Sequence, residues 1–174
     1  MIIHYVGDLH QPLHGTSEVD HSFPKGDFGG NLHKLPSDLD TGVGDLHAVW
    51  DSVIYELPGY ETLPMDSDTW DFYTNLNLRL EKDHPIDPEK EKITSFADWA
   101  NESLAMSEEL VYPAFVEHVK PDDDYIEKAR PALEERIVLA GWRLADLVIS
   151  IYKPQMLTTV TEVTPADDET VFLQ

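Results

Sequence analysis

The sequence has no cysteine and few basic residues. Without cysteine there are no disulfides and no thiolate metal sites, so histidine, aspartate and glutamate are the strong metal ligands that remain. Only 12 basic residues stand against 34 acidic ones, a formal net charge of −22. This balance disfavours a protein that holds duplex DNA on a basic face. Bound divalent cations, or histidines protonated below about pH 6.5, would reverse the charge locally.

Long apolar runs are also missing. No run reaches the roughly 18 to 20 residues that a membrane span needs, and the first residues lack the basic and apolar regions of a signal peptide. A chain of 174 residues with 41% hydrophobic content suits one soluble globular domain. The composition therefore predicts no membrane span and leaves the compartment open.

Glycine and proline divide the chain into helical segments and one long irregular stretch. Residues 1–11 predict the end of a helix that a proline stops. Residues 15–45, rich in Gly, Ser, Thr and Asp, predict a long loop or a small hairpin. Further helices are expected over residues 45–57, 68–82, 94–112 and 122–152. The predicted class is mainly α.

The end of the chain differs in composition from the rest. Residues 154–174 are acidic and rich in Thr and Val, which favours a tail or an added edge strand over a core helix. We therefore divide the chain into a domain over residues 1–153 and a tail over residues 154–174. Pro131 lies inside a predicted helix and indicates a kink or a late start.

Aromatic residues and histidines outside the main motif receive structural interpretations. One buried face of the helix over 68–82 is predicted from the spacing of Trp70, Tyr73, Leu76 and Leu80. We expect Trp50, Trp99 and Trp142 to pack in the core. His10 is expected to lie behind a metal site or at the surface, and four histidines are expected to be solvated: His21, His33, His84 and His118. The glycine pair in Gly29-Gly30-Asn31 suits positive φ and a close approach of the backbone to a metal.

Two pairs of residues have the spacing of a helical metal site. His4 with Asp8, and His47 with Asp51, lie four residues apart, so each pair shares one helix face. His14 follows the first pair after a helix-ending proline. Two imidazoles and a carboxylate are the ligands of an open catalytic zinc site. The alternatives are a core histidine for His4, caps or surface acids for Asp8 and Asp51, and a loop residue for His14.

Five motifs in order carry a resemblance to a known family. They are "HYVGDLHQPLH", "GDFGGN", "DLHAVWD", "SFADWANES" and "AGWRLADLV". Together they resemble the S1/P1 nucleases, which share the all-helical fold of zinc-dependent phospholipase C. By motif position, the resemblance implies that His14, His47 and Asp51 hold one zinc ion. It implies that His4 binds another, and that Asp8 lies between two zinc ions and is catalytic.

The resemblance also implies an activity and a cofactor. Such sites cluster up to three zinc ions and hydrolyse single-stranded DNA or RNA and 3′-nucleotides. The family's secreted or lumenal location is a further expectation. The chain resembles only the C-terminal portion of the family, so one zinc ion has its full ligand set here. We expect activity to need the missing N-terminal portion, which a second polypeptide could carry.

Two other classes of function stay open on the sequence. A phospholipase C-like enzyme on the same scaffold would need an apolar rim that faces lipid, and no exposed apolar cluster is evident in the sequence. A non-catalytic zinc-binding remnant or scaffold is suggested by the absent ligands and the large negative charge.

Overall fold

The computed structural model describes the backbone of residues 1–37, 42–57, 63–113 and 115–161. Within these residues the chain is helical, and its one β-type pairing is an isolated antiparallel bridge between Lys34 and Asp45. The mainly α class is therefore confirmed. The elements are α1 (Ile2–His10), the 3-10 turn η1 (Pro12–His14), α2 (Leu46–Asp51), α3 (Ser67–Asp83), α4 (Pro88–Glu91), α5 (Phe96–Met106), the π-helical turn η2 (Ser107–Val111) and α6 (Asp123–Thr161).

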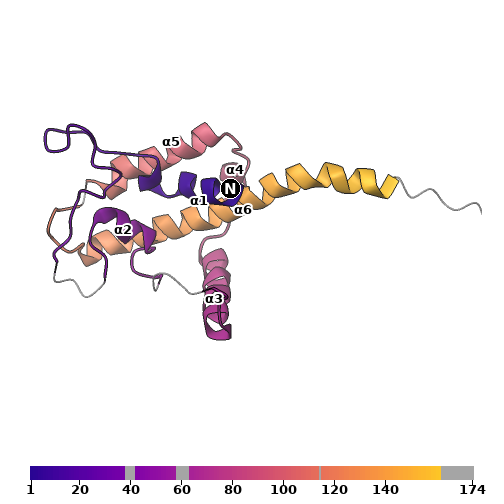
Figure 1. The fold of residues 1–174 in the computed structure, drawn as a ribbon, viewed down its shortest axis with the longest axis horizontal. Coiled ribbons are helices and arrows are strands. Elements are labelled where there is room, and N and C mark those ends of the chain that lie inside the picture. The colour runs from indigo at the N-terminus through magenta and orange to yellow at the C-terminus, as the bar shows by residue number, and fades with distance from the viewer. Residues whose placement is uncertain (38–41, 58–62, 114, 162–174) are drawn as a thin grey trace, which may run out of the picture.

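Helix α6 is the longest helix among the described residues. Figure 1 shows α6 running the length of the molecule, with α1 beside its first half, α5 next to α1, and the last turns of α6 extending beyond the other helices. At 39 residues it is about 58 Å long. It runs through Pro131, so the predicted late start is wrong. Helix α6 continues to Thr161, so residues 154–161 are helical where a tail or an edge strand was expected. The rest of the predicted tail, residues 162–174, lies outside the described residues.

Side chains that cap the helices explain where the elements begin. The Asp45 carboxylate accepts a hydrogen bond from the Ala48 N–H at the start of α2, and the Ser95 hydroxyl accepts one from the Asp98 N–H at the start of α5. Pro12 ends α1 as predicted, because a proline nitrogen cannot continue the helical hydrogen bonding. The segment between η1 and α2 is irregular over its described residues and forms no hairpin.

The hydrophobic core lies between η1, α2, η2 and the start of α6. Its largest member is Trp50, which is buried and donates a hydrogen bond from Nε1 to the Tyr125 hydroxyl at 2.8 Å. Leu13 and Leu46, next to candidate ligands in the sequence, are buried in the same cluster. The residues that flank His14 and His47 are thus fixed by packing.

A buried charged network joins α1, α5 and α6. Arg136 and Arg143, both on α6, contact the Glu102 carboxylate on α5. Arg136 also donates to the carbonyl oxygens of Leu9 and His10 at 3.3 Å, which caps the end of α1. The end of α1 is therefore held by α6.

His10 belongs to this network, so a position at the surface is excluded. Its Nδ1 donates to the Val6 carbonyl oxygen at 2.7 Å, and its Nε2 accepts from Arg143 at 2.8 Å. Burial, together with the charges of Arg136 and Arg143, lowers the pKa of His10 to about 4. The imidazole is therefore neutral in the folded protein at neutral pH.

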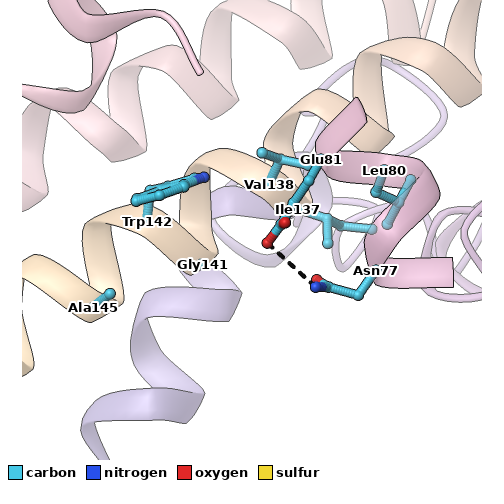
Figure 2. Close-up of a pocket in the computed structure, with 8 residues that line it drawn as sticks. All are labelled: Asn77, Leu80, Glu81, Ile137, Val138, Gly141, Trp142 and Ala145. Atoms are coloured by element: carbon cyan, nitrogen blue, oxygen red, sulfur yellow. Dashed lines mark hydrogen bonds between the residues drawn. The ribbon is translucent and has the colours of Figure 1, made fainter. Parts of the chain in front are cut away.

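Helix α3 buries fewer residues of its predicted apolar face than the sequence spacing indicated. Trp70 is 64% exposed, and Leu80 is the buried residue of the predicted face. Figure 2 shows Leu80 facing Ile137 and Val138 of α6 across a pocket of about 290 Å³. Trp142 at its edge is 43% exposed, so it packs less completely than expected.

No helix in the described ranges combines the length and apolar composition that a bilayer span requires.

Lowering the pH should destabilise the fold through His10. Because the pKa of this group lies below its unfolded value of about 6.5, the unfolded chain binds the extra proton, and stability is lost as the pH falls from 6.5 towards 4. We expect a loss of about 2 kcal/mol by pH 5 from this group. Urea unfolding at pH 7 and pH 5 measures it. His10→Gln, which keeps an acceptor for Arg143, should remove the loss, whereas His118→Gln at an exposed site should leave it intact.

Candidate metal centre

The candidate ligands come from two segments that the core brings together. His14 lies at the end of η1, two residues after the proline that stops α1. His47 and Asp51 lie one turn apart on α2, whose start the Asp45 cap fixes. The predicted helical spacing of the second pair is therefore realised in the structure.

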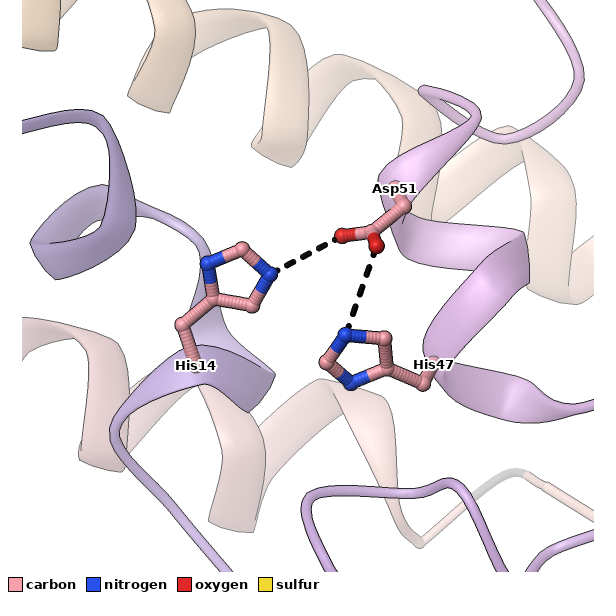
Figure 3. Close-up of side chains that lie close together, drawn as sticks. All are labelled: His14, His47 and Asp51. Carbon is pink, nitrogen blue, oxygen red and sulfur yellow. Dashed lines mark hydrogen bonds and ion pairs between the residues drawn. The ribbon is translucent and has the colours of Figure 1, made fainter. Parts of the chain in front are cut away.

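His14, His47 and Asp51 converge on one point. The Asp51 carboxylate lies between the two imidazoles, with Oδ1 3.1 Å from His14 Nε2 and Oδ2 3.3 Å from His47 Nε2 (Figure 3). The two rings stack at 5.1 Å between centroids. One ligand atom from each residue lies within 4.8 Å of the others. The three side chains are partly open to solvent, as an accessible site requires.

A backbone carbonyl determines which ring nitrogen of His47 carries the hydrogen. His47 Nδ1 lies 2.8 Å from the Gly29 carbonyl oxygen, which can only accept, so Nδ1 carries the hydrogen. The lone pair of the neutral ring is then on Nε2, which faces Asp51. A carbonyl oxygen behind the ligating ring is a common arrangement in metal sites because it fixes the tautomer and the ring orientation.

The loop that supplies this carbonyl depends on glycine at two positions. Gly29 has φ +63 and Gly30 φ +83, in the left-handed region. A Cβ at Gly29 would lie 2.3 Å from the Leu13 carbonyl oxygen, and one at Gly30 would lie 3.2 Å from the His47 nitrogen. The expected positive φ is confirmed at both glycines, and the approach of this backbone to a metal stays a prediction.

Asp27 organises the same loop. Its buried carboxylate accepts hydrogen bonds from the N–H groups of Glu18, Gly29 and Gly30 and from the hydroxyls of Ser17 and Tyr112. Burial raises the pKa of Asp27, but these hydrogen bonds outweigh burial and lower it below its usual value. Asp27 is therefore an anion at neutral pH, and its carboxylate holds the loop through these hydrogen bonds.

A second group of possible ligands surrounds Asp27. His33 is 13% exposed, with Nε2 2.9 Å from a Glu18 oxygen and 3.5 Å from Asp27 Oδ2, so its predicted solvation is wrong. The five hydrogen bonds already made to Asp27 occupy its lone pairs. We interpret this group as structural. The one signal for this group in the sequence is that Asp27 lies two residues before the glycine pair.

The Asp51 carboxylate and the two imidazoles shift one another's pKa values. Hydrogen bonding to Asp51 raises the pKa of both His14 and His47 above the ordinary value. Burial raises the pKa of Asp51, but hydrogen bonds from His14, His47 and Gln11 outweigh burial and hold it well below its usual range. Asp51 is thus an anion at neutral pH, as a ligand to a cation must be.

The residues present fit a zinc ion. Two imidazole nitrogens and one carboxylate form the three-ligand set of open catalytic zinc sites, in which a further position remains for water or substrate. His14 Nε2, His47 Nε2 and an oxygen of Asp51 are close enough to share one ion. This set is the one that the motif position implied.

His4 and Asp8 lie beside this site without joining it. Asp8 Oδ2 is 3.2 Å from His4 Nε2, and Asp8 Oδ1 is 3.0 Å from His14 Nδ1. Across the described residues, no group of three ligands includes His4 or Asp8. Their roles as ligands, and the catalytic role of Asp8, stay predictions. Asp8 Oδ1 is placed to accept a hydrogen bond from His14 Nδ1.

The fold and the site define a helical domain with a candidate metal centre between η1 and α2. A family model described as S1/P1 Nuclease matches residues 1–153, and the chain belongs to this family. Nuclease S1 of Aspergillus oryzae is 28% identical over 162 residues, covering 86% of this chain and 53% of that protein. Endonuclease 5 of Arabidopsis thaliana is 28% identical over 161 residues, covering 88% and 51%. The chain thus spans about half the length of these relatives.

Replacing Gly29 should damage the loop and the site together. Gly29→Ala places a Cβ against the Leu13 carbonyl oxygen at a positive φ, and we expect a loss of about 2 kcal/mol or more in the free energy of unfolding. Chemical denaturation measures it. Gly141→Ala is the matched control, because no atom lies within 4 Å of the added Cβ and an alanine favours helix α6. Equal effects of the two substitutions would contradict the role of the loop.

Zinc binding should weaken as the pH falls. Protons compete for the Nε2 atoms of His14 and His47, whose pKa values lie above the ordinary value. Below both values, affinity should fall by up to about 100-fold per pH unit, because two protons must leave. Calorimetry in buffers of different ionisation enthalpy counts the protons released. Binding of equal strength at pH 7.5 and pH 5.5 would contradict this site.

Proposed function

We propose that this protein is a zinc-dependent phosphodiesterase that hydrolyses single-stranded DNA or RNA and 3′-nucleotides. The observation that carries the proposal is the convergence of His14, His47 and Asp51 on one point. Membership of the S1/P1 nuclease family and two relatives named as a nuclease and an endonuclease support it.

The roles of the residues follow from their positions. His14 Nε2, His47 Nε2 and an Asp51 oxygen would hold the zinc ion. When bound, zinc supplies a Lewis acid that stabilises negative charge on a phosphate and lowers the pKa of water. The Asp8 carboxylate, in contact with His14 Nδ1, keeps this imidazole oriented and offers Oδ2 as an acceptor for a proton from the attacking water.

The acidic chain places a condition on the substrate. With a net charge of −22, the protein repels polyanions at long range, so bound cations must provide the local attraction. The family resemblance implies up to three zinc ions, with His4 and Asp8 contributing to those not held by Asp51. A second polypeptide that carries the family's N-terminal portion would complete the ligand set of those ions.

A phospholipase C-like activity is the second candidate, and one observation favours it. An apolar cavity of about 660 Å³ lies beside Asp8 and His14, lined by Ile2, Tyr5 and Phe96 among others. The expectation that no apolar cluster is exposed is therefore wrong. The same cavity is suited to the apolar part of a lipid phosphodiester.

Parallel assays should separate the candidates. With zinc present and the chain joined to an N-terminal portion from a family member, we expect hydrolysis of single-stranded DNA and 3′-AMP, no hydrolysis of phosphatidylcholine, and loss of activity on adding a chelator. His47→Asn should lower the rate at least about 100-fold because a ligand is lost, whereas His118→Asn at the surface should not change it. Faster cleavage of phosphatidylcholine would favour the phospholipase. If the chain binds zinc but hydrolyses none of these substrates, even when it is joined to an N-terminal portion from a family member, the remaining candidate is a non-catalytic zinc-binding scaffold.

A further inference from the structure

Gln11 links the two segments that carry the candidate ligands. It follows α1 in an extended conformation, with φ −88 and ψ 117, as a residue before proline prefers. Its Oε1 accepts a hydrogen bond from the Leu13 N–H, which caps η1. Its Nε2 donates to Asp51 Oδ1 on α2 at 2.8 Å. One side chain thus connects the turn that ends at His14 with the helix that carries Asp51.

The orientation of the Gln11 amide is determined by its partners. The Leu13 N–H can only donate, so it requires the amide oxygen. The ionised Asp51 carboxylate can only accept, so it requires the amide nitrogen. Rotating the amide by half a turn would break both contacts. The donor is therefore directed at Asp51 by the cap that holds the oxygen.

Gln11 differs from the other partners of Asp51. In the part of the chain that the structure describes, the side chains that bond to the Asp51 carboxylate are Gln11, His14 and His47. The two histidines reach it through Nε2, the atoms that would turn to a metal ion. Gln11 is then the partner that stays available to hold the carboxylate once the ion is bound.

We propose that Gln11 is a positioning residue for the metal centre. The proposal rests on the proposed function. The Gln11 amide donates to Asp51 Oδ1 and so fixes the carboxylate with Oδ1 directed at His14 and Oδ2 directed at His47. A hydrogen bond to a charged acceptor is stronger than a neutral one. Partners of this kind set metal affinity because they orient the ligand before the ion arrives.

Two substitutions separate positioning from capping. Gln11→Met has a similar length and removes both hydrogen bonds. Gln11→Asn keeps an oxygen that can cap η1, a role for which asparagine is well suited, but its amide is one methylene too short for Asp51. Asn77→Leu is the matched control, because it removes an exposed amide whose side-chain hydrogen bond, among the described residues, is to Glu81 and which lies on α3, away from the candidate centre.

The measurement is zinc affinity by competition with a chelator, together with the melting temperature of the zinc-free protein. We expect both Gln11 variants to bind zinc about 10- to 100-fold more weakly than the wild type, and Asn77→Leu to bind normally. Gln11→Asn should keep the wild-type melting temperature within a few degrees. Wild-type affinity in Gln11→Asn would overturn the proposal, because capping alone would then suffice. A wild type that binds no zinc would overturn the proposed function itself.

Discussion

The contact between two arginines of α6 and one glutamate of α5 holds the end of the first helix in place. Arg136 and Arg143 are buried, and the Glu102 carboxylate contacts both. Arg136 also donates hydrogen bonds to the carbonyl oxygens of Leu9 and His10 in the last turn of α1. Removing Glu102 would leave two guanidinium groups buried without a carboxylate partner, which costs about 3 to 5 kcal/mol. The turn that carries the first candidate ligand starts at this helix end, so its position depends on charges far away in the sequence.

The other half of the candidate metal centre depends on the buried Asp27 carboxylate. Asp27 accepts hydrogen bonds from backbone N–H groups and two hydroxyls, and the resulting loop turns the Gly29 carbonyl towards His47. The two halves meet at Asp51, which bonds to His14 and Gln11 through Oδ1 and contacts His47 through Oδ2. The candidate centre thus lies where these two parts of the chain meet.

The sequence predicts features that depend on local geometry. The helical spacing of His47 and Asp51, the stop at Pro12 and the positive φ of Gly29 each follow from a few neighbouring residues, and the structure confirms them. Features that depend on distant residues were missed. His33 is enclosed because Glu18 and Asp27 reach it across a loop that has no repeating pattern. Gln11, likewise, meets a helix that lies 40 residues away.

The tautomer of His47 has a kinetic consequence. Because the Gly29 carbonyl keeps the hydrogen on Nδ1, the neutral ring offers its ligating nitrogen without a proton shift between ring atoms. Since the carbonyl belongs to the loop around Asp27, order in that loop and occupancy of the centre are thermodynamically linked. An ion that prefers the ordered loop also stabilises it, by an amount that grows with the logarithm of ion concentration.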